Sequence, residues 1–149
     1  GSRGFMVEIH ELTDPAKGAM TRVFSDRIDA ARVSRVSAVL EKRTGLRFSD
    51  QDIYVNVAGG VRLVESAIDL ALAAALYSAR TDIASPGATA LVGELSLAGE
   101  VRPVAKLKAR VKAAVALGFS RVLAPEAEGG ATGVRDIKDA ITKLFGNKG

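Results

Sequence analysis

The sequence DIYVNVAGGVRLVESAIDLA (residues 52–71) is the first of three stretches that decide the fold of this 149-residue chain. Apolar and polar residues alternate over Asp52–Val57, which predicts a strand, and the pair Gly59-Gly60 ends it. From about Glu65 to Arg80 the chain is apolar nearly all round, which predicts a buried central helix. The order strand, glycine break, buried helix is the frame to which the other elements attach.

The second stretch, VGELSLAGEVRPV (residues 92–104), predicts a hairpin of two strands, Ala90–Leu95 and Glu100–Val104, turned at Gly99. The third stretch, KLKARVKAAVALGF (residues 106–119), predicts a helix over Ala105–Leu117 that is capped by Gly118. Its predicted buried stripe consists of Leu107, Val111, Ala114 and Val115.

Outward from these stretches, periodicity and turn residues predict the remaining elements. They are a strand over Phe5–Leu12, a loop over Thr13–Thr21, a helix over Asp26–Arg43 followed by Gly45, a turn at Ser85–Gly87, a strand over Arg121–Ala124, a glycine-rich loop over Glu126–Gly133 and an amphipathic helix over Asp136–Phe145. The predicted inward residues of the two helices are Ile28, Val33, Val36, Val39 and Leu40, and Ile137, Ile141 and Leu144. Strands and helices interleave without a strict βαβ rhythm, so we expect one α+β domain with a mixed sheet packed with helices.

Positive charge is clustered along the chain, although the net charge is only +4. The run Val101–Pro125 contains no acidic residue and carries Arg102, Lys106, Lys108, Arg110, Lys112 and Arg121. A second cluster comprises Arg27, Arg32, Arg35, Lys42, Arg43 and Arg47. Clustered cations are typical of phosphate-backbone binding, and a solvated helix face is the alternative explanation.

Several kinds of chemistry are excluded or disfavoured by the composition. The chain has no cysteine, so it forms no disulfide or thiolate zinc site, and no GxxxxGK[ST] phosphate loop occurs. Its single histidine, His10, lies in a predicted strand far from any serine motif. Glu65 and Asp69 are four residues apart on one helix, and we expect a structural role for them, with Asp69 bonded to a backbone group or an arginine. No apolar run reaches the roughly 18 uncharged residues that a membrane span needs.

The three stretches and their order resemble the proteolytic domain of Lon, where a serine begins a helix and a hairpin leads into a helix with a catalytic lysine. A closer resemblance is to the C-terminal domain of the bacterial DNA-repair ATPases RadA/Sms. It covers essentially the whole chain and is carried by Gly1–Arg3, Val7–Ile9, Val39–Leu46, Asp50–Arg62, Gly93–Val104 and Lys112–Arg121.

The resemblance carries the two catalytic positions of Lon to Ala67 and Lys108. Lysine is present, but alanine has no hydroxyl, so no catalytic residue is expected. The neighbouring Ser66 points about 100° away around the helix. A Ser-Lys dyad needs a separation of about 3 Å, so a peptidase with a displaced serine is the alternative. Without a serine at position 67, we expect Lys108 to be an exposed or snorkelling lysine that has no catalytic role.

The resemblance implies a cytoplasmic, C-terminal fragment of a larger DNA-dependent ATPase that acts in recombination and repair. Its zinc motif and RecA-like ATPase are absent from this chain, so ATP, magnesium and zinc are expected only in those domains, with no cofactor or metal in this one. The implied partners are DNA, single-stranded or branched, and further copies of the chain in a hexameric ring, with no membrane.

Two functions remain beside the peptidase: a scaffold that also binds DNA, and an oligomerisation module without nucleic-acid contact. The acid-free run favours the first. The expected nucleic-acid contacts are Arg22, Arg27, Arg32, Arg35, Arg102, Lys106 and Arg110.

Overall fold

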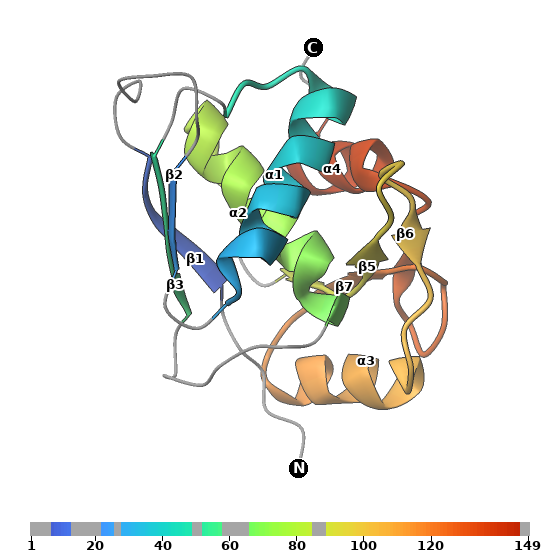
Figure 1. The fold of residues 1–149 in the computed structure, drawn as a ribbon. Coiled ribbons are helices and arrows are strands. Elements are labelled where there is room, and N and C mark those ends of the chain that lie inside the picture. Colours follow the sequence, from blue (N-terminus) through green and yellow to red (C-terminus); the bar gives the residue numbers. More distant parts are fainter. Residues whose placement is uncertain are drawn as a thin grey trace.

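The computed structural model describes residues 7–12, 22–25, 28–48, 52–57, 66–84 and 89–146. The loop predicted over 13–21 and the turn predicted over 85–87 lie outside these residues. The described part is a mixture of four helices and short strands (Figure 1), and it agrees with the predicted α+β class and mixed strand directions.

The first sheet has the order β1-β3-β2. Strand β1 (Val7–Leu12) runs antiparallel to β3 (Asp52–Val57), with an irregularity in register between Ile9 and Glu11. Both strands were predicted. Strand β2 (Arg22–Ser25) runs parallel to β3 and was not predicted, because four residues give too short a pattern to separate from a loop.

Helix α1 (Ala30–Thr44) begins later than predicted because Asp29 serves as its N-cap. The Asp29 carboxylate accepts a hydrogen bond from the Ala31 N–H at 3.1 Å, which satisfies one of the helix's free donors. Gly45 ends the helix in the left-handed conformation at a φ of 80°, as predicted. All five residues predicted to face inward from this region are buried.

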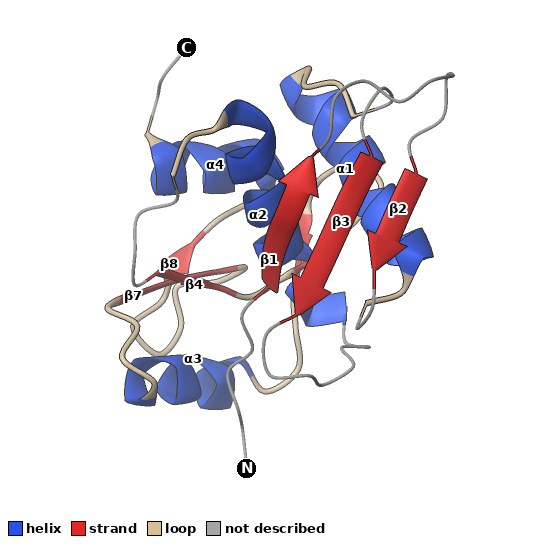
Figure 2. Ribbon diagram, turned by 90° about the vertical axis from the view of Figure 1, so that its left-hand side faces the viewer, coloured by secondary structure: helices blue, strands red, loops and turns tan. Residues whose placement is uncertain are grey.

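Helix α2 (Asp69–Thr81), preceded by a single 3-10 turn η1 (Ser66–Ile68), is the central helix that the sequence predicts. Its apolar residues are buried on several sides, including Leu70, Leu72 and Leu76. The first sheet covers one side of the paired helices α1 and α2 (Figure 2), and the main core lies among these elements and the C-terminal helix.

A second sheet of three parallel strands has the order β4-β7-β8, from β4 (Thr89–Leu91), β7 (Arg121–Ala124) and β8 (Thr132–Gly133). It lies between α3 (Leu107–Ala116) and α4 (Ile137–Phe145) (Figure 2). In β7, Leu123 packs into the main core with α4, whereas Val122 and Ala124 pack against α3. This alternation is what a strand with both faces covered requires.

The strand predicted over Ala90–Leu95 is wrong at Gly93, where the chain leaves one sheet and enters another. Strand β4 ends at Leu91, and β5 (Glu94–Leu95) pairs instead with β6 (Val101–Arg102), which confirms the hairpin. The Gly93 N–H donates to the Ala67 carbonyl at 2.9 Å, and the Gly93 carbonyl accepts from the Leu70 N–H at 3.0 Å. A Cβ at Gly93 would lie 2.7 Å from a Val101 methyl group, so this close approach requires glycine.

Helix α4 holds the other side of the hairpin. The Ile137 N–H donates to the Gly99 carbonyl at 2.8 Å, and the Val101 N–H donates to the Arg135 carbonyl at 2.9 Å. Its N-cap, Asp136, accepts from the Asp139 N–H at 2.7 Å. Burial raises the pKa of Asp139, but hydrogen bonds from the Arg135 N–H and from Lys143 outweigh it, so the pKa lies below its usual value.

A buried ion cluster joins α1, α2 and the hairpin. The Asp69 carboxylate is fully buried and accepts from Arg32 at 2.8 Å, from Arg35 at 3.0 Å and from the Leu95 N–H at 3.0 Å. Arg35 also donates to the Leu95 carbonyl at 3.0 Å. The predicted structural role of Asp69, bonded to arginine and backbone, is therefore confirmed.

We predict that Asp69→Asn lowers the free energy of unfolding by about 3 kcal/mol or more, because breaking a buried ion pair leaves uncompensated charge behind. The matched control is Asp82→Asn, the same chemical change at an exposed helix end where the left-handed backbone suits asparagine. We expect that control to stay within about 0.5 kcal/mol of the parent. Urea unfolding of the three proteins measures the difference, and equal stabilities for the two variants would contradict the structural role of the cluster.

Candidate functional site

The hairpin leads into α3, the helix that carries Lys108, Arg110 and Lys112 of the acid-free run. Leu107, Val111 and Ala114 are buried against β7, as predicted, and they fix which side of α3 faces solvent. The prediction that Val115 is buried is wrong, since 59% of this residue is exposed. Val115 lies one position around the helix from Ala114, and the small second sheet covers only a narrow stripe of α3.

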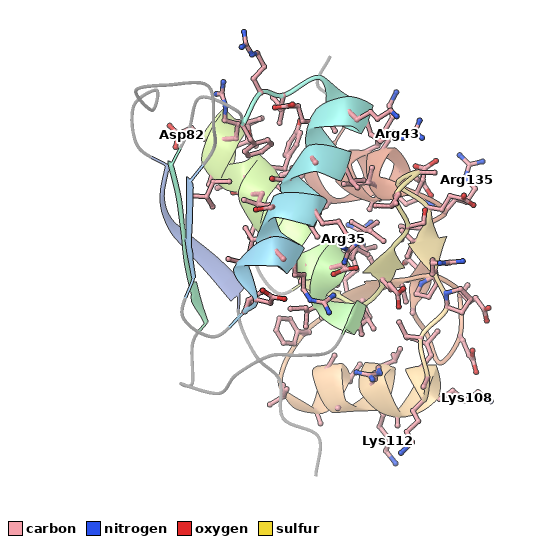
Figure 3. All side chains as sticks on the ribbon, in the orientation of Figure 1. Arg35, Arg43, Asp82, Lys108, Lys112 and Arg135 are labelled. Carbon is pink, nitrogen blue, oxygen red and sulfur yellow. The ribbon has the colours of Figure 1, made fainter. Side chains whose placement is uncertain are left out.

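The outer face of α3 carries the exposed lysines Lys108 and Lys112. Figure 3 shows both side chains extending from α3 away from the body of the protein. The Lys108 side chain is 77% exposed, and its amine lies 4.0 Å from a carboxylate oxygen of Glu128. We define the outer face of α3 by Lys108 and Lys112 together with Lys106, which immediately precedes the helix, and all three residues are exposed.

Lys106 stands just before the first turn of α3 in the left-handed conformation, with a φ of 57°. Such a backbone costs a non-glycine residue about 1 kcal/mol or more, and strained residues of this kind are concentrated at functional sites. The Lys106 carbonyl accepts from the Arg110 N–H at 3.0 Å, so the two residues are one turn apart, as the sequence predicts.

Arg110 is half-buried rather than fully projecting. Its Nε donates to the Ala105 carbonyl at 2.8 Å, which folds the guanidinium back along the start of the helix. Arg102, in β6, is exposed on the segment that enters α3. Arg102, Lys106 and Arg110 therefore belong to one continuous hairpin-to-helix segment, and their role as phosphate contacts stays a prediction.

The second set of predicted contacts has a different setting. Arg32 and Arg35 both bind the buried Asp69 carboxylate, so part of their hydrogen-bonding capacity serves the core. Figure 3 shows Arg35 reaching from α1 toward the hairpin. Arg22 lies in β2, where only the backbone is described, and Arg27 lies outside the described residues.

The positions that correspond to the Lon dyad lie in different surroundings. Ala67 is buried in the turn η1, and its carbonyl accepts the Gly93 N–H. The amine of Lys108 is exposed and beside Glu128, whereas a lysine that takes a proton from serine works best when it is desolvated. The side chains of Ser66 and His10, and all of Glu65, lie outside what the structure describes.

Sequence reasoning missed Glu128 because it lies outside the acid-free run. The turn at Glu126–Ala131 folds back and brings this carboxylate to α3. Within the described ranges, no group of three or more His, Cys, Asp or Glu side chains is placed to hold a metal ion. Nor is any helix in those ranges both long and apolar enough to cross a membrane.

Comparison with known proteins gives two findings. A family model described as subunit ChlI of Mg-chelatase matches residues 22–128. A protein named DNA repair protein RadA from Treponema pallidum (strain Nichols) is 66% identical over 125 residues, which are 84% of this chain and 28% of that protein.

Two further proteins of the same name are also similar. That of Bacillus subtilis (strain 168) is 45% identical over 127 residues, 85% of this chain and 28% of the relative. That of Listeria monocytogenes (serovar 1/2a, strain ATCC BAA-679 / EGD-e) is 38% identical over 154 residues, 97% of this chain and 34% of the relative. The chain thus spans about a third or less of these relatives. It belongs to the RadA family of DNA repair proteins, and its residues 22–128 also match the family described as subunit ChlI of Mg-chelatase.

Proposed function

We propose that this chain is a non-proteolytic, Lon-like scaffold and DNA-binding domain of a RadA/Sms-type DNA repair and recombination ATPase. The RadA relatives support the repair assignment. The Lon-like assignment is supported by the order of β3, η1 with α2, the β5–β6 hairpin and α3, which follows the three stretches that resemble Lon. In this proposal the ATPase chemistry, with its ATP, magnesium and zinc, resides in other parts of a cytoplasmic protein.

The observation that carries DNA binding is the outer face of α3. Lys106, Lys108 and Lys112 are exposed there, and Arg102 precedes them on the same segment. Exposed cations on a helix and on the segment before it attract the phosphate backbone without reading bases. The two tyrosines and five phenylalanines of the chain offer few stacking platforms, so we expect little sequence preference.

The first test measures the binding of a labelled single-stranded oligonucleotide over a salt series. We expect Lys106→Ala with Arg110→Ala to weaken binding, and each lost phosphate contact to lower the slope of log affinity against log salt by about 0.7 to 1. Lys106→Gly is a sharper variant, because glycine relieves the left-handed backbone while removing the charge. It should lose affinity without losing stability.

Arg22→Ala with Arg27→Ala tests the second cluster in the same assay. Arg32 and Arg35 are left intact, since replacing them would also disturb the buried Asp69. Parent-like affinity and salt slope in both double variants would mean that the cations are solvated faces and that the domain is only a scaffold.

A second candidate function is a Ser-Lys peptidase with Ser66 as a displaced nucleophile. We predict that a serine-reactive fluorophosphonate probe, followed by mass spectrometry, labels nothing in the folded chain, because Ala67 lacks a hydroxyl. The Ser66→Ala variant is the control. Labelling of the parent at Ser66 that disappears in this variant would overturn the non-proteolytic assignment. Ala67→Ser should not give efficient turnover, because the Lys108 amine is exposed and beside Glu128.

Self-association is the other part of the proposal. Leu97, 74% exposed, lies in the turn of the β5–β6 hairpin, whereas Val115, 59% exposed, lies in the last turn of α3 and Leu117, 54% exposed, directly follows that helix. Two apolar patches on different elements suit a head-to-tail contact, in which one face of a copy binds another face of the next. Such contacts form a ring when the rotation between successive copies closes, and a hexamer is the ring that we propose for the full-length protein.

We expect weak, concentration-dependent association of the isolated chain in sedimentation velocity experiments. Leu97→Ser should reduce it, as should Val115→Ser with Leu117→Ser. A mixture of the two variants should recover a dimer but nothing larger, because each supplies the patch that the other lacks. A tight closed dimer of the parent without larger species would contradict the head-to-tail arrangement.

A further inference from the structure

The turn at Glu126–Ala131 lies against α3 and places negative charge beside its outer face. A Cβ added to Gly129 would lie 3.8 Å from the Lys108 Cα and 3.7 Å from the Val111 side chain, so the turn is in close contact with the helix. The Glu128 carboxylate lies 4.0 Å from the Lys108 amine. The run Val101–Pro125 contains no acidic residue in sequence, but in the folded chain the Glu128 carboxylate lies beside it.

Backbone contacts hold this turn in place. The Glu128 N–H donates to the Glu126 carbonyl at 2.9 Å, and the Ala131 N–H donates to the Glu128 carbonyl at 3.1 Å. Gly129 has a φ of 66°, which glycine adopts without strain. On the other side, Gly133 of β8 packs near the Ala127 nitrogen, which a Cβ would approach to 3.3 Å. Glu128 therefore stands beside Lys108 because of the local fold and not through a chance side-chain encounter.

We propose that Glu128 is an electrostatic brake on nucleic-acid binding: it holds Lys108 in an ion pair that a phosphate group must displace. The inference rests on the proposed DNA-binding function of the outer face of α3. It assigns Lys108 the role of a conditional phosphate contact: Lys108 binds a phosphate group only when the nucleic-acid strand displaces Glu128.

The strength of the pair suits such a role. Glu128 is 37% exposed and Lys108 is 77% exposed, and an exposed pair of this kind is weak and screened by salt. A nucleic-acid strand that is already bound at Lys106 or Lys112 raises the local phosphate concentration beside Lys108. The Lys108–Glu128 ion pair can therefore break without any loss of the fold. The carboxylate then opposes binding of single phosphates more effectively than binding of a long strand.

The test compares Glu128→Gln with Glu126→Gln in the oligonucleotide assay with the 149-residue chain. Both variants remove one negative charge from the same turn, but the described part of the chain gives Glu126 no ion-pair partner. We expect Glu128→Gln to raise the affinity at low salt by about two- to fivefold. It should also steepen the salt slope by about 0.7, one phosphate contact on a single strand. The control should change the affinity much less and leave the slope unchanged.

A double-mutant cycle identifies the partner. In the parent, Lys108→Gln should reduce affinity only slightly, because Glu128 already occupies the amine. In the Glu128→Gln background, Lys108→Gln should abolish the whole gain in DNA affinity that Glu128→Gln produced. It should also restore the parent's slope of log affinity against log salt. Thermal melts of all variants should coincide, since the exposed pair contributes little to stability.

The outcomes separate this inference from the function on which it rests. If the parent binds DNA and Glu128→Gln leaves affinity and slope unchanged, the brake is wrong and the DNA-binding function stands. The brake is equally wrong if Glu126→Gln has the same effect as Glu128→Gln, because general charge repulsion then accounts for the gain. If the parent binds no DNA at any salt concentration, both proposals fail.

Discussion

The buried Asp69 carboxylate is the interaction on which the arrangement of the other elements depends. It begins α2, binds two arginines of α1 and accepts the backbone N–H of Leu95 in the hairpin. Burying a carboxylate is costly unless charge and hydrogen bonds compensate for it, so this contact specifies how three segments meet. Because the hairpin continues into α3, the same contact fixes where the exposed cations of α3 stand relative to the core.

Arg32 and Arg35 illustrate the limit of charge counting along a sequence. They lie in a basic cluster of the sequence and were therefore predicted to contact phosphate, but both side chains bind the buried Asp69 carboxylate. The outer face of α3 differs, because its lysines Lys106, Lys108 and Lys112 are all exposed. Only the partner of each cation separates the two cases, and the partner of Arg35 is 34 residues away in the chain. The structural role of Asp69 could be anticipated from its burial in an apolar helix, but not which of the arginines would bind it.

Local patterns predicted most elements well, and the misses have local causes. The apolar periodicity of α1 identified its buried residues, and that of α4 identified Ile137 and Leu144, whereas Ile141 is only half-buried. The burial of α2 was predicted because it is apolar nearly all round, and the glycine after α1 identified the end of that helix. Strands β2 and β8, of four and two residues, are too short to show a period. Gly93 looked like the middle of a strand, whereas it marks a close backbone approach to η1 and α2. The candidate site followed the same rule: its cations were predictable, and Glu128, which the fold brings back to α3, was not.

The Ala67 region is held by backbone hydrogen bonds and by the Asp69 carboxylate. The Ala67 carbonyl and the Leu70 N–H both bind Gly93, and Asp69 between them anchors the ion cluster. None of these contacts uses a side-chain hydroxyl at position 67, so a residue without a hydroxyl there keeps all of them. The frame still holds the hairpin and α3 in place, and α3 then serves as a rigid support for surface charge. Exposed cations on a frame held by backbone contacts suit the scaffold and DNA-binding function that we propose.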